Sequence, residues 1–286
     1  MRRVHMLSSD VKVGIAAAGF LGCQILFLVF REVIERRTNR KFAQDAANRI
    51  PALLHGTLLS IAGHAVVVRC AGVAATDCTP LASWAEAAGA FSTGYMMWDL
   101  LCMQQIGYEH AVPLSLHHAA SAAACVLVIY WCPEGLWFMA ALMMTETTVP
   151  FENAAWLLNW RRDCGRGAQH GGGALGASRR LLLLVWVLYR ILLFVPYFKA
   201  VVGSHAAVRA ASYPLLCTVY GMGAVLTAFN IGGLLQVVLP NVREDRQWAE
   251  QKPSLRTPSQ QLGTPRRNPR RTVRVGTPCK SATASH

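Results

Sequence analysis

The feature that most constrains this chain is a series of long apolar segments that follow one another from residue 13 to residue 239. A helix needs about 20 mostly apolar residues to cross the roughly 30 Å hydrocarbon core of a bilayer, and these segments approach that length. They lack the polar face of a helix on a soluble protein. The sequence therefore predicts an all-α polytopic membrane protein with about seven transmembrane helices, near residues 13–30, 50–69, 88–107, 114–132, 135–158, 180–202 and 211–239.

The composition divides the chain into three parts. Residues 1–48 hold an N-terminal segment, the first predicted span and a basic loop, and residues 49–240 hold the other apolar segments. In residues 241–286, Pro, Ser, Thr, Arg and Gln replace the aliphatic residues. Too little apolar surface remains there to offset the entropy lost on ordering, so we expect a disordered basic tail.

Basic residues predict the orientation, because Lys and Arg in short loops are retained on the cytosolic side. Two loops and the tail are rich in them, whereas the alternate loops are nearly free of them; the loop residues are Arg31, Arg36, Arg37, Arg40, Lys41, Arg49, Arg161, Arg162, Arg166, Arg179 and Arg180. This places the C-terminus in the cytosol and the N-terminus outside or in the lumen. Arg2, Arg3 and Lys12 oppose that orientation, but they are fewer. An integral protein of the endoplasmic reticulum or another endomembrane is expected.

The formal net charge of +13 does not indicate a nucleic-acid partner, because most of it lies where the positive-inside rule places it. Basic residues next to a membrane attract anionic lipid by about 1 kcal/mol each. Membrane lipids, including an anionic surface at the loops and tail, are therefore the expected partners, and self-association is compatible with the sequence. The cysteines do not indicate a metal site, because no Cys-x-x-Cys pair occurs, and none is expected. Cys70, Cys78 and Cys132 lie at the predicted lumenal side, where a disulfide can form.

A set of ionisable residues lies inside the predicted spans: Asp99, His117, His118, Glu146, Glu152 and Arg190. A charged side chain at the bilayer centre costs roughly 2.5–3.5 kcal/mol on insertion scales, so such residues usually face the interior of a bundle and mark a working site. From their positions along the spans we expect a polar cavity in the cytosolic half. Taken singly, each has a structural alternative; Arg190, for example, would simply pair with Glu146 or Glu152.

Local spacing favours a shared interior face for some of these residues. Tyr95 lies four residues before Asp99, and Asn153 lies seven after Glu146, so each pair occupies one side of its helix. The adjacent residues His117 and His118 point about 100° apart on a helix. We therefore expect one histidine to line the cavity and the other to hold it in place.

Three blocks of sequence resemble one family of membrane proteins. They are GYMMWD at residues 94–99, LHHAAS at residues 116–121 and TETTVPFEN at residues 145–153. Their order and spacing are similar to those of the TLC-domain family, which includes the ceramide synthases and the translocating chain-associated membrane proteins. The likeness covers roughly residues 49–240 and is closest to the small TLC-domain-containing transmembrane proteins. The resemblance implies a TLC-like bundle that binds or handles lipid.

Two functions follow from this resemblance. In the first, the chain binds lipid or maintains lipid composition, and its cavity holds the headgroup of a sphingolipid or phospholipid through Tyr95, Asp99, His118, Glu146, Asn153 and Arg190. In the second, it transfers an acyl chain from acyl-CoA, its cosubstrate, to a lipid amine or hydroxyl, and needs no other cofactor. His117 or His118 would be the general base, oriented by Asp99 or Glu146.

The third block differs from that of the ceramide synthases, which disfavours the second function. Ceramide synthases carry a His-Asp and a further Asp there, whereas this chain has Thr145-Glu146 and Glu152-Asn153. A third function, metal-dependent hydrolysis or hydroxylation through His55, His117 and His118, is disfavoured because adjacent histidines do not share a helix face. Whether the chain is an enzyme stays open between the first two functions.

Overall fold

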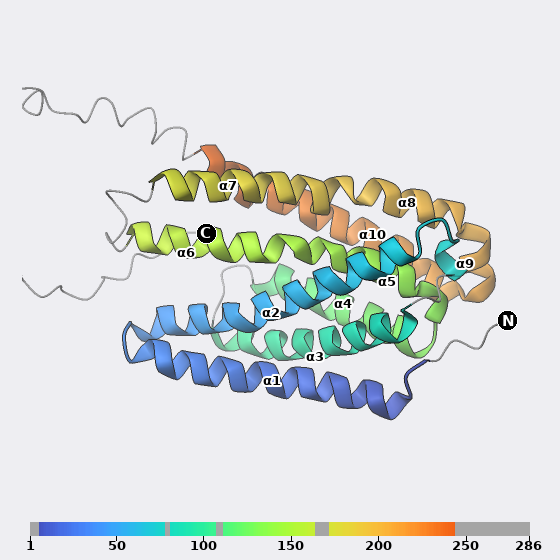
Figure 1. Ribbon diagram of the computed structural model, residues 1–286, viewed down its shortest axis with the longest axis horizontal. Helices are drawn as coiled ribbons and strands as arrows, with labels where there is room; N and C mark the ends of the chain where they lie inside the picture. Colours follow the sequence, from blue (N-terminus) through green and yellow to red (C-terminus); the bar gives the residue numbers. More distant parts are fainter. Residues whose placement is uncertain (1–5, 78–80, 107–110, 164–171, 244–286) are drawn as a thin grey trace, which may run out of the picture.

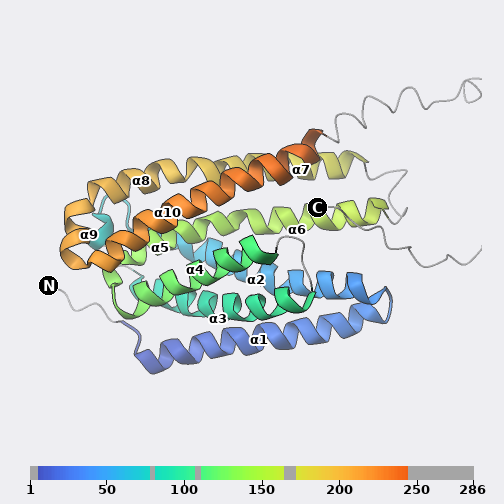
Figure 2. The ribbon, with the colours of Figure 1, turned by 180° about the vertical axis from the view of Figure 1, so that it is seen from behind.

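The computed structural model describes residues 6–77, 81–106, 111–163 and 172–243. Within these ranges the regular structure is helical throughout and contains no strand, which confirms the predicted all-α class. The helices run side by side along the long axis of one elongated bundle (Figures 1 and 2). This arrangement suits a bilayer, because a helix satisfies its backbone polar groups internally.

The helices follow one another as antiparallel rods. The first four are α1 (Ser9–Glu35), α2 (Arg40–Arg69), α3 (Ala82–Ile106) and α4 (Ala111–Tyr130). The next rod joins α5 (Leu136–Met143) to α6 (Val149–Asp163) through the 3₁₀ segment η3 (Met144–Thr148). The following rod joins α7 (Gly172–Trp186) to α8 (Phe194–Gly203) through the π-helical segment η4 (Val187–Leu192). The short helix α9 (His205–Ala211) comes next. The last rod consists of α10 (Tyr213–Gly233) and the π-helical segment η5 (Leu234–Val238). Short 3₁₀ turns lie at η1 (Ala75–Asp77) and η2 (Pro133–Gly135).

Four helical rods in the described part of the chain are long and apolar enough to cross a membrane: Ser9–Glu35, Arg40–Arg69, Gly173–Gly203 and Tyr213–Arg243. They coincide with the first, second, sixth and seventh predicted spans. The apolar helix Leu114–Tyr130 is shorter. Large apolar side chains point outward from the bundle, for example Leu21, Ile61 and Val202, as expected of a surface that faces lipid. The integral membrane class is thus supported, and the count of seven stays a prediction.

Prolines explain where three of these rods depart from α-helical geometry. Proline has no N–H to donate to the carbonyl four residues earlier, and its ring clashes with that carbonyl. Pro150, Pro196 and Pro240 stand four residues after Glu146, Leu192 and Gln236, which lie in η3, η4 and η5. Before Pro150, the departure takes the form of a 3₁₀ segment directly before α6.

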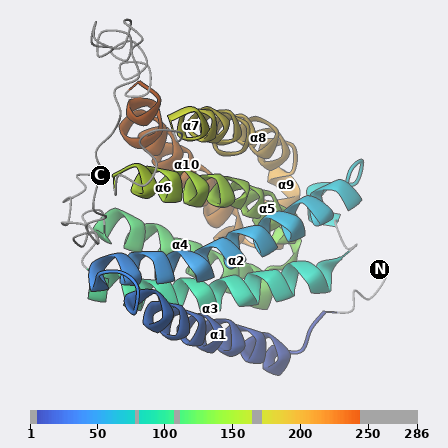
Figure 3. The same cartoon turned by 60° about the vertical axis from the view of Figure 1, so that its left-hand side comes forward.

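α1 lies at the outer side of the bundle and packs against α2 and α3 (Figure 3). Its buried Lys12 forms an ion pair with Glu86 of α3 and donates a hydrogen bond to the carbonyl of Ile129 in α4. Farther along, a Cβ at Gly94 of α3 would overlap the carbonyl oxygen of Ala16, so the two helices touch through their backbones. In the sequence, Lys12 is a basic residue on the predicted lumenal side and opposes the predicted orientation. In the structure, it is buried and paired rather than free in a loop.

The cysteines at the predicted lumenal side differ from one another. Cys70 is disulfide-bonded, whereas Cys132 is a buried free thiol. Cys78 lies outside the described residues. The three-part division at residues 48 and 240 stays a prediction, and most of the predicted tail also lies outside the described residues.

Candidate functional site

An internal cavity lies in the middle of the bundle, enclosed mainly by α3, α4, α5, α8 and α10. It has about 650 Å³ of empty volume, part of which is open to the outside. Most of its wall is apolar: Leu59, Met96, Ala124, Cys125, Val128, Gly135, Phe138, Met139, Leu142, Met143, Tyr197, Val219, Met222 and Leu226. The other lining residues are His117, Glu146, Ser92, Ser121, Thr145 and Thr218. The cavity is therefore an apolar space with few polar groups.

The ionisable groups of the cavity wall, His117 and Glu146, lie toward one end. His117 stands near the start of α4, where its ring stacks on Phe229 of α10 with centroids 4.9 Å apart and planes at 8°. Val128 lines the wall eleven residues farther along α4. Glu146 likewise follows Gly135 by eleven residues in the neighbouring rod. The cavity thus has its two ionisable groups at one end, the polar end, and a mostly apolar floor at the other, where Thr218 is the polar lining residue.

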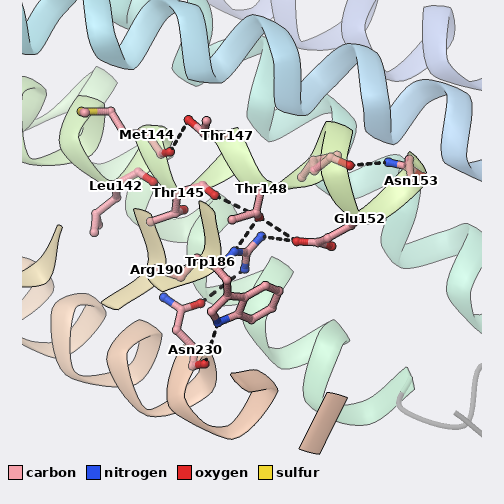
Figure 4. A network of polar contacts seen from close by, with 11 residues as sticks. Leu142, Met144, Thr145, Thr147, Thr148, Glu152, Asn153, Trp186, Arg190 and Asn230 are labelled. Atoms are coloured by element: carbon pink, nitrogen blue, oxygen red, sulfur yellow. Dashed lines mark hydrogen bonds and ion pairs between the residues drawn. The ribbon is translucent and has the colours of Figure 1, made fainter. Parts of the chain in front are cut away.

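Arg190 is the centre of a buried hydrogen-bond network beside this polar end (Figure 4). Its Nε donates to Oγ1 of Thr148 at 2.8 Å, and its Nη1 and Nη2 donate to Asn230 and Glu152, each at 3.3 Å. Its guanidinium lies 4.7 Å from the ring centroid of Trp186. The network therefore ties η3, η4, α6 and α10 together at one level.

The two glutamates near Arg190 differ in their surroundings. Glu152 pairs with Arg190 and also accepts a hydrogen bond from Thr148 at 2.7 Å. Glu146 makes no hydrogen bond or ion pair with the residues that the structure describes, and it lines the cavity. Of the two pairings proposed for Arg190, the structure has the one with Glu152, which leaves the Glu146 carboxylate available to a ligand.

A second polar group connects α3 and α4 behind the cavity wall. Nδ1 of His118 lies 3.1 Å from Oδ2 of Asp99, and both side chains are largely buried. The ring of Tyr95 stacks on His55 with centroids 3.9 Å apart, and His55 hydrogen-bonds Ser92 at 3.0 Å. Tyr95, Asp99 and His118 do not line the cavity. The wall thus receives His117, while His118 is held against Asp99.

A family model described as TLC domain matches residues 45–237. The chain belongs to the TLC domain family. The match confirms the resemblance read from the three sequence blocks, and it includes the cavity, the Arg190 network and the pair Asp99–His118. No curated protein and no solved structure compared with the chain matches it. α1 lies before the matched TLC domain, although it is packed against it.

Asn153 lies within the TLC domain but does not reach the cavity. Its amide nitrogen donates to the carbonyl of Val149 at 2.9 Å, and its amide oxygen accepts from Arg49 of α2 at 3.4 Å. The guanidinium of Arg49 also lies 4.3 Å from the ring centroid of Trp156. Asn153 therefore joins α6 to α2, and the lipid-binding role predicted for it stays a prediction.

Sequence reasoning missed several residues of the TLC domain that complete the site. Thr148 and Trp186 contact Arg190, and Phe229 covers His117. Thr148 stands four residues before Glu152, a spacing that places both on one helix face and was a usable signal. Trp186 and Phe229 gave none, because aromatic residues occur throughout the apolar segments. Within the described residues, no group of three or more His, Cys, Asp or Glu side chains is placed to hold a metal ion.

Proposed function

We propose that this TLC domain binds a single membrane lipid, with the hydrocarbon chain in the cavity and the polar head at His117 and Glu146. The observation that carries the proposal is the cavity itself, whose wall is apolar except for a few groups. Ligand sites are typically concavities with apolar walls and few polar groups that fix orientation. Membership of a membrane family related to lipid supports the same conclusion.

The polar end favours a headgroup that donates hydrogen bonds. Glu146 is an acceptor without a partner among the described residues, and no Lys or Arg lines the cavity. The three nitrogens of Arg190 already donate to Thr148, Asn230 and Glu152. A buried acceptor left unpaired costs free energy, so a hydroxyl, amine or amide N–H stabilises this end. A sphingolipid headgroup offers such donors.

The proposal includes a place for the protein in the cell. The basic loops favour an orientation with the C-terminus in the cytosol and the polar end of the cavity in the cytosolic half of the bilayer. We expect a protein of the endoplasmic reticulum or another endomembrane that maintains lipid composition. The nearer likeness to the small TLC-domain-containing proteins is part of the same proposal.

Lipid retained through purification tests this function. The full chain is purified in a mild detergent, and bound lipid is extracted and identified by mass spectrometry. We expect a defined lipid at near-stoichiometric amount, several-fold less of it in Glu146→Ala, and an unchanged amount in the control Asn153→Ala, because Asn153 faces α2. Equal lipid content in all three proteins would contradict a site at Glu146.

Acyl transfer is the second candidate, and the position of His117 favours it. An imidazole in the wall of a lipid cavity is suitably placed to act as general base on an acceptor amine or hydroxyl. The test is turnover of isotope-labelled acyl-CoA with a panel of sphingoid bases and lysolipids, read by mass spectrometry. A product that is absent with His117→Ala would establish an acyltransferase. No product, together with a co-purifying lipid, would leave the binding function alone.

A further inference from the structure

We infer that the depth of the cavity selects the length of the bound hydrocarbon chain, and that the floor at Val128, Gly135 and Val219 sets this depth. The inference rests on the proposed function, because it assumes that the chain of a lipid occupies the cavity. It adds a criterion of selection to that function: the polar end fixes the head, and the floor limits how many carbons fit below it.

The floor is tightly packed. A Cβ at Gly135 would lie 2.7 Å from Cδ1 of Leu215 and 2.9 Å from Cγ2 of Val128, both closer than ordinary contacts allow. Tyr197 is almost fully buried there, and its hydroxyl donates to the carbonyl of Val219 at 2.8 Å. The Tyr197 hydroxyl is therefore satisfied, and Thr218, next to Val219, is the polar lining residue at this level. A chain that reaches these residues cannot extend farther without displacing them.

Two α-helices beside the cavity give the same depth. His117 and Val128 are eleven residues apart in α4, and Val219 lies ten residues before Phe229, which stacks on His117, in α10. At about 1.5 Å of rise per residue, these separations correspond to roughly 15–17 Å. An extended hydrocarbon chain advances about 1.25 Å per carbon, from bonds of about 1.5 Å at near-tetrahedral angles. The space between polar end and floor therefore holds roughly 12–13 carbons.

Ala124 offers a way to change the depth. It lines the cavity one helical turn above Val128, so a leucine at this position would project into the path of the chain. One turn is about 5–6 Å, which corresponds to roughly four or five carbons. The neighbouring Ala123 is exposed on the outside of the bundle, where lipid can accommodate a larger side chain. The two alanines therefore form a matched pair, one inside the cavity and one outside.

The experiment measures chain-length preference with a defined probe. The purified full chain and its variants are incubated with an equimolar mixture of monoacylglycerols with saturated chains of 8–20 carbons, and the retained lipids are measured by mass spectrometry. We expect the unmodified protein to enrich chains near 12–14 carbons. Ala124→Leu should shift the maximum to chains shorter by four or five carbons, whereas Ala123→Leu should keep the original profile.

A second variant distinguishes a change in cavity depth from a simple loss of lipid binding. Val128→Ala removes two methyl groups from the floor and should move the maximum one or two carbons longer, while Val126→Ala, which does not line the cavity, should not. Unchanged profiles in both Ala124→Leu and Val128→Ala, with lipid retained, would overturn the inference and leave the proposed function standing. No retained monoacylglycerol in the unmodified protein, combined with no co-purifying lipid, would overturn both.

Discussion

The ion pair that joins α1 to α3 provides a sharp test of how the first helix is held. Lys12 and Glu86 have side chains that are 5% and 0% exposed, and each has a further backbone partner, Ile129 and Leu7. Replacing Glu86 with leucine leaves a buried ammonium without its counter-ion. Replacing Lys12 with methionine leaves a buried carboxylate in the same condition.

The expected magnitudes follow from the cost of burying a charge alone. Breaking a buried pair by removing one partner costs about 3–5 kcal/mol, whereas replacing both partners with apolar residues of similar volume is often close to neutral. We therefore expect Glu86→Leu and Lys12→Met each to lower the free energy of unfolding by about 3–5 kcal/mol, and the double variant to recover most of the loss. The control is Glu32→Leu, which removes an exposed pair with Arg36 and should cost less than about 1 kcal/mol.

The assay is unfolding of the purified protein in mixed micelles with an increasing fraction of sodium dodecyl sulfate, followed by circular dichroism. The four variants and the unmodified protein give one double-mutant cycle and one matched control. The reasoning would be refuted if the two single losses simply added in the double variant, because that result would mean no coupling between Lys12 and Glu86. It would also be refuted if Glu32→Leu cost as much as Glu86→Leu.

Three further predictions concern the site, the packing and the orientation. Arg190→Lys should lower the free energy of unfolding by about 1–3 kcal/mol, because one ammonium cannot replace a guanidinium fork with three partners. The control Arg180→Lys, on the exposed side of α7, should leave the free energy of unfolding unchanged. Equal stability of the two variants would argue against the Arg190 network. Gly94→Ala should lower the melting temperature, because its Cβ would overlap the carbonyl of Ala16, while Gly14→Ala, with nothing within 4 Å, should leave it unchanged; no loss at Gly94 would contradict the close α1–α3 contact. An epitope tag at the C-terminus should bind antibody when the plasma membrane alone is permeabilised; a tag that needs the endomembranes opened would reverse the orientation.

Much of the fold could be predicted because a bilayer leaves few alternatives. Long apolar runs must form helices there, so their positions predicted the helical rods closely. The exact local geometry was harder. Pro150 indicated an interruption of the α-helix. Whether the helical turn near a proline becomes the tighter 3₁₀ form, as in η3, or the wider π form, as in η4, depends on the neighbouring helices. The burial of Lys12 could not be predicted either, because its partner Glu86 lies 74 residues away in the sequence.

The sequence predicted that Asp99, His118, Glu152 and Arg190 share one interior region, but it did not decide their partners. In the structure, His118 pairs with Asp99 and Arg190 pairs with Glu152. The sequence could not decide which histidine lines the cavity, because the rotation of α4 is fixed by contacts with α3 and α10. The choice of Glu152 over Glu146 as the partner of Arg190 likewise depends on the 3₁₀ geometry between them.

The π-helical segment η4 corrects an angular drift along the sixth rod. Trp186, Arg190 and Phe194 are all buried on one side, yet each step between them is four residues. In a regular α-helix four residues overshoot a full turn by about 40°, so two steps would carry Phe194 roughly 80° away from Trp186. The wider π turn absorbs that rotation. Deleting one residue from η4 would therefore remove the wide turn and still leave both halves facing the bundle, because Phe194 would then follow Trp186 by seven residues, which is about 700° of a regular α-helix and close to two full turns.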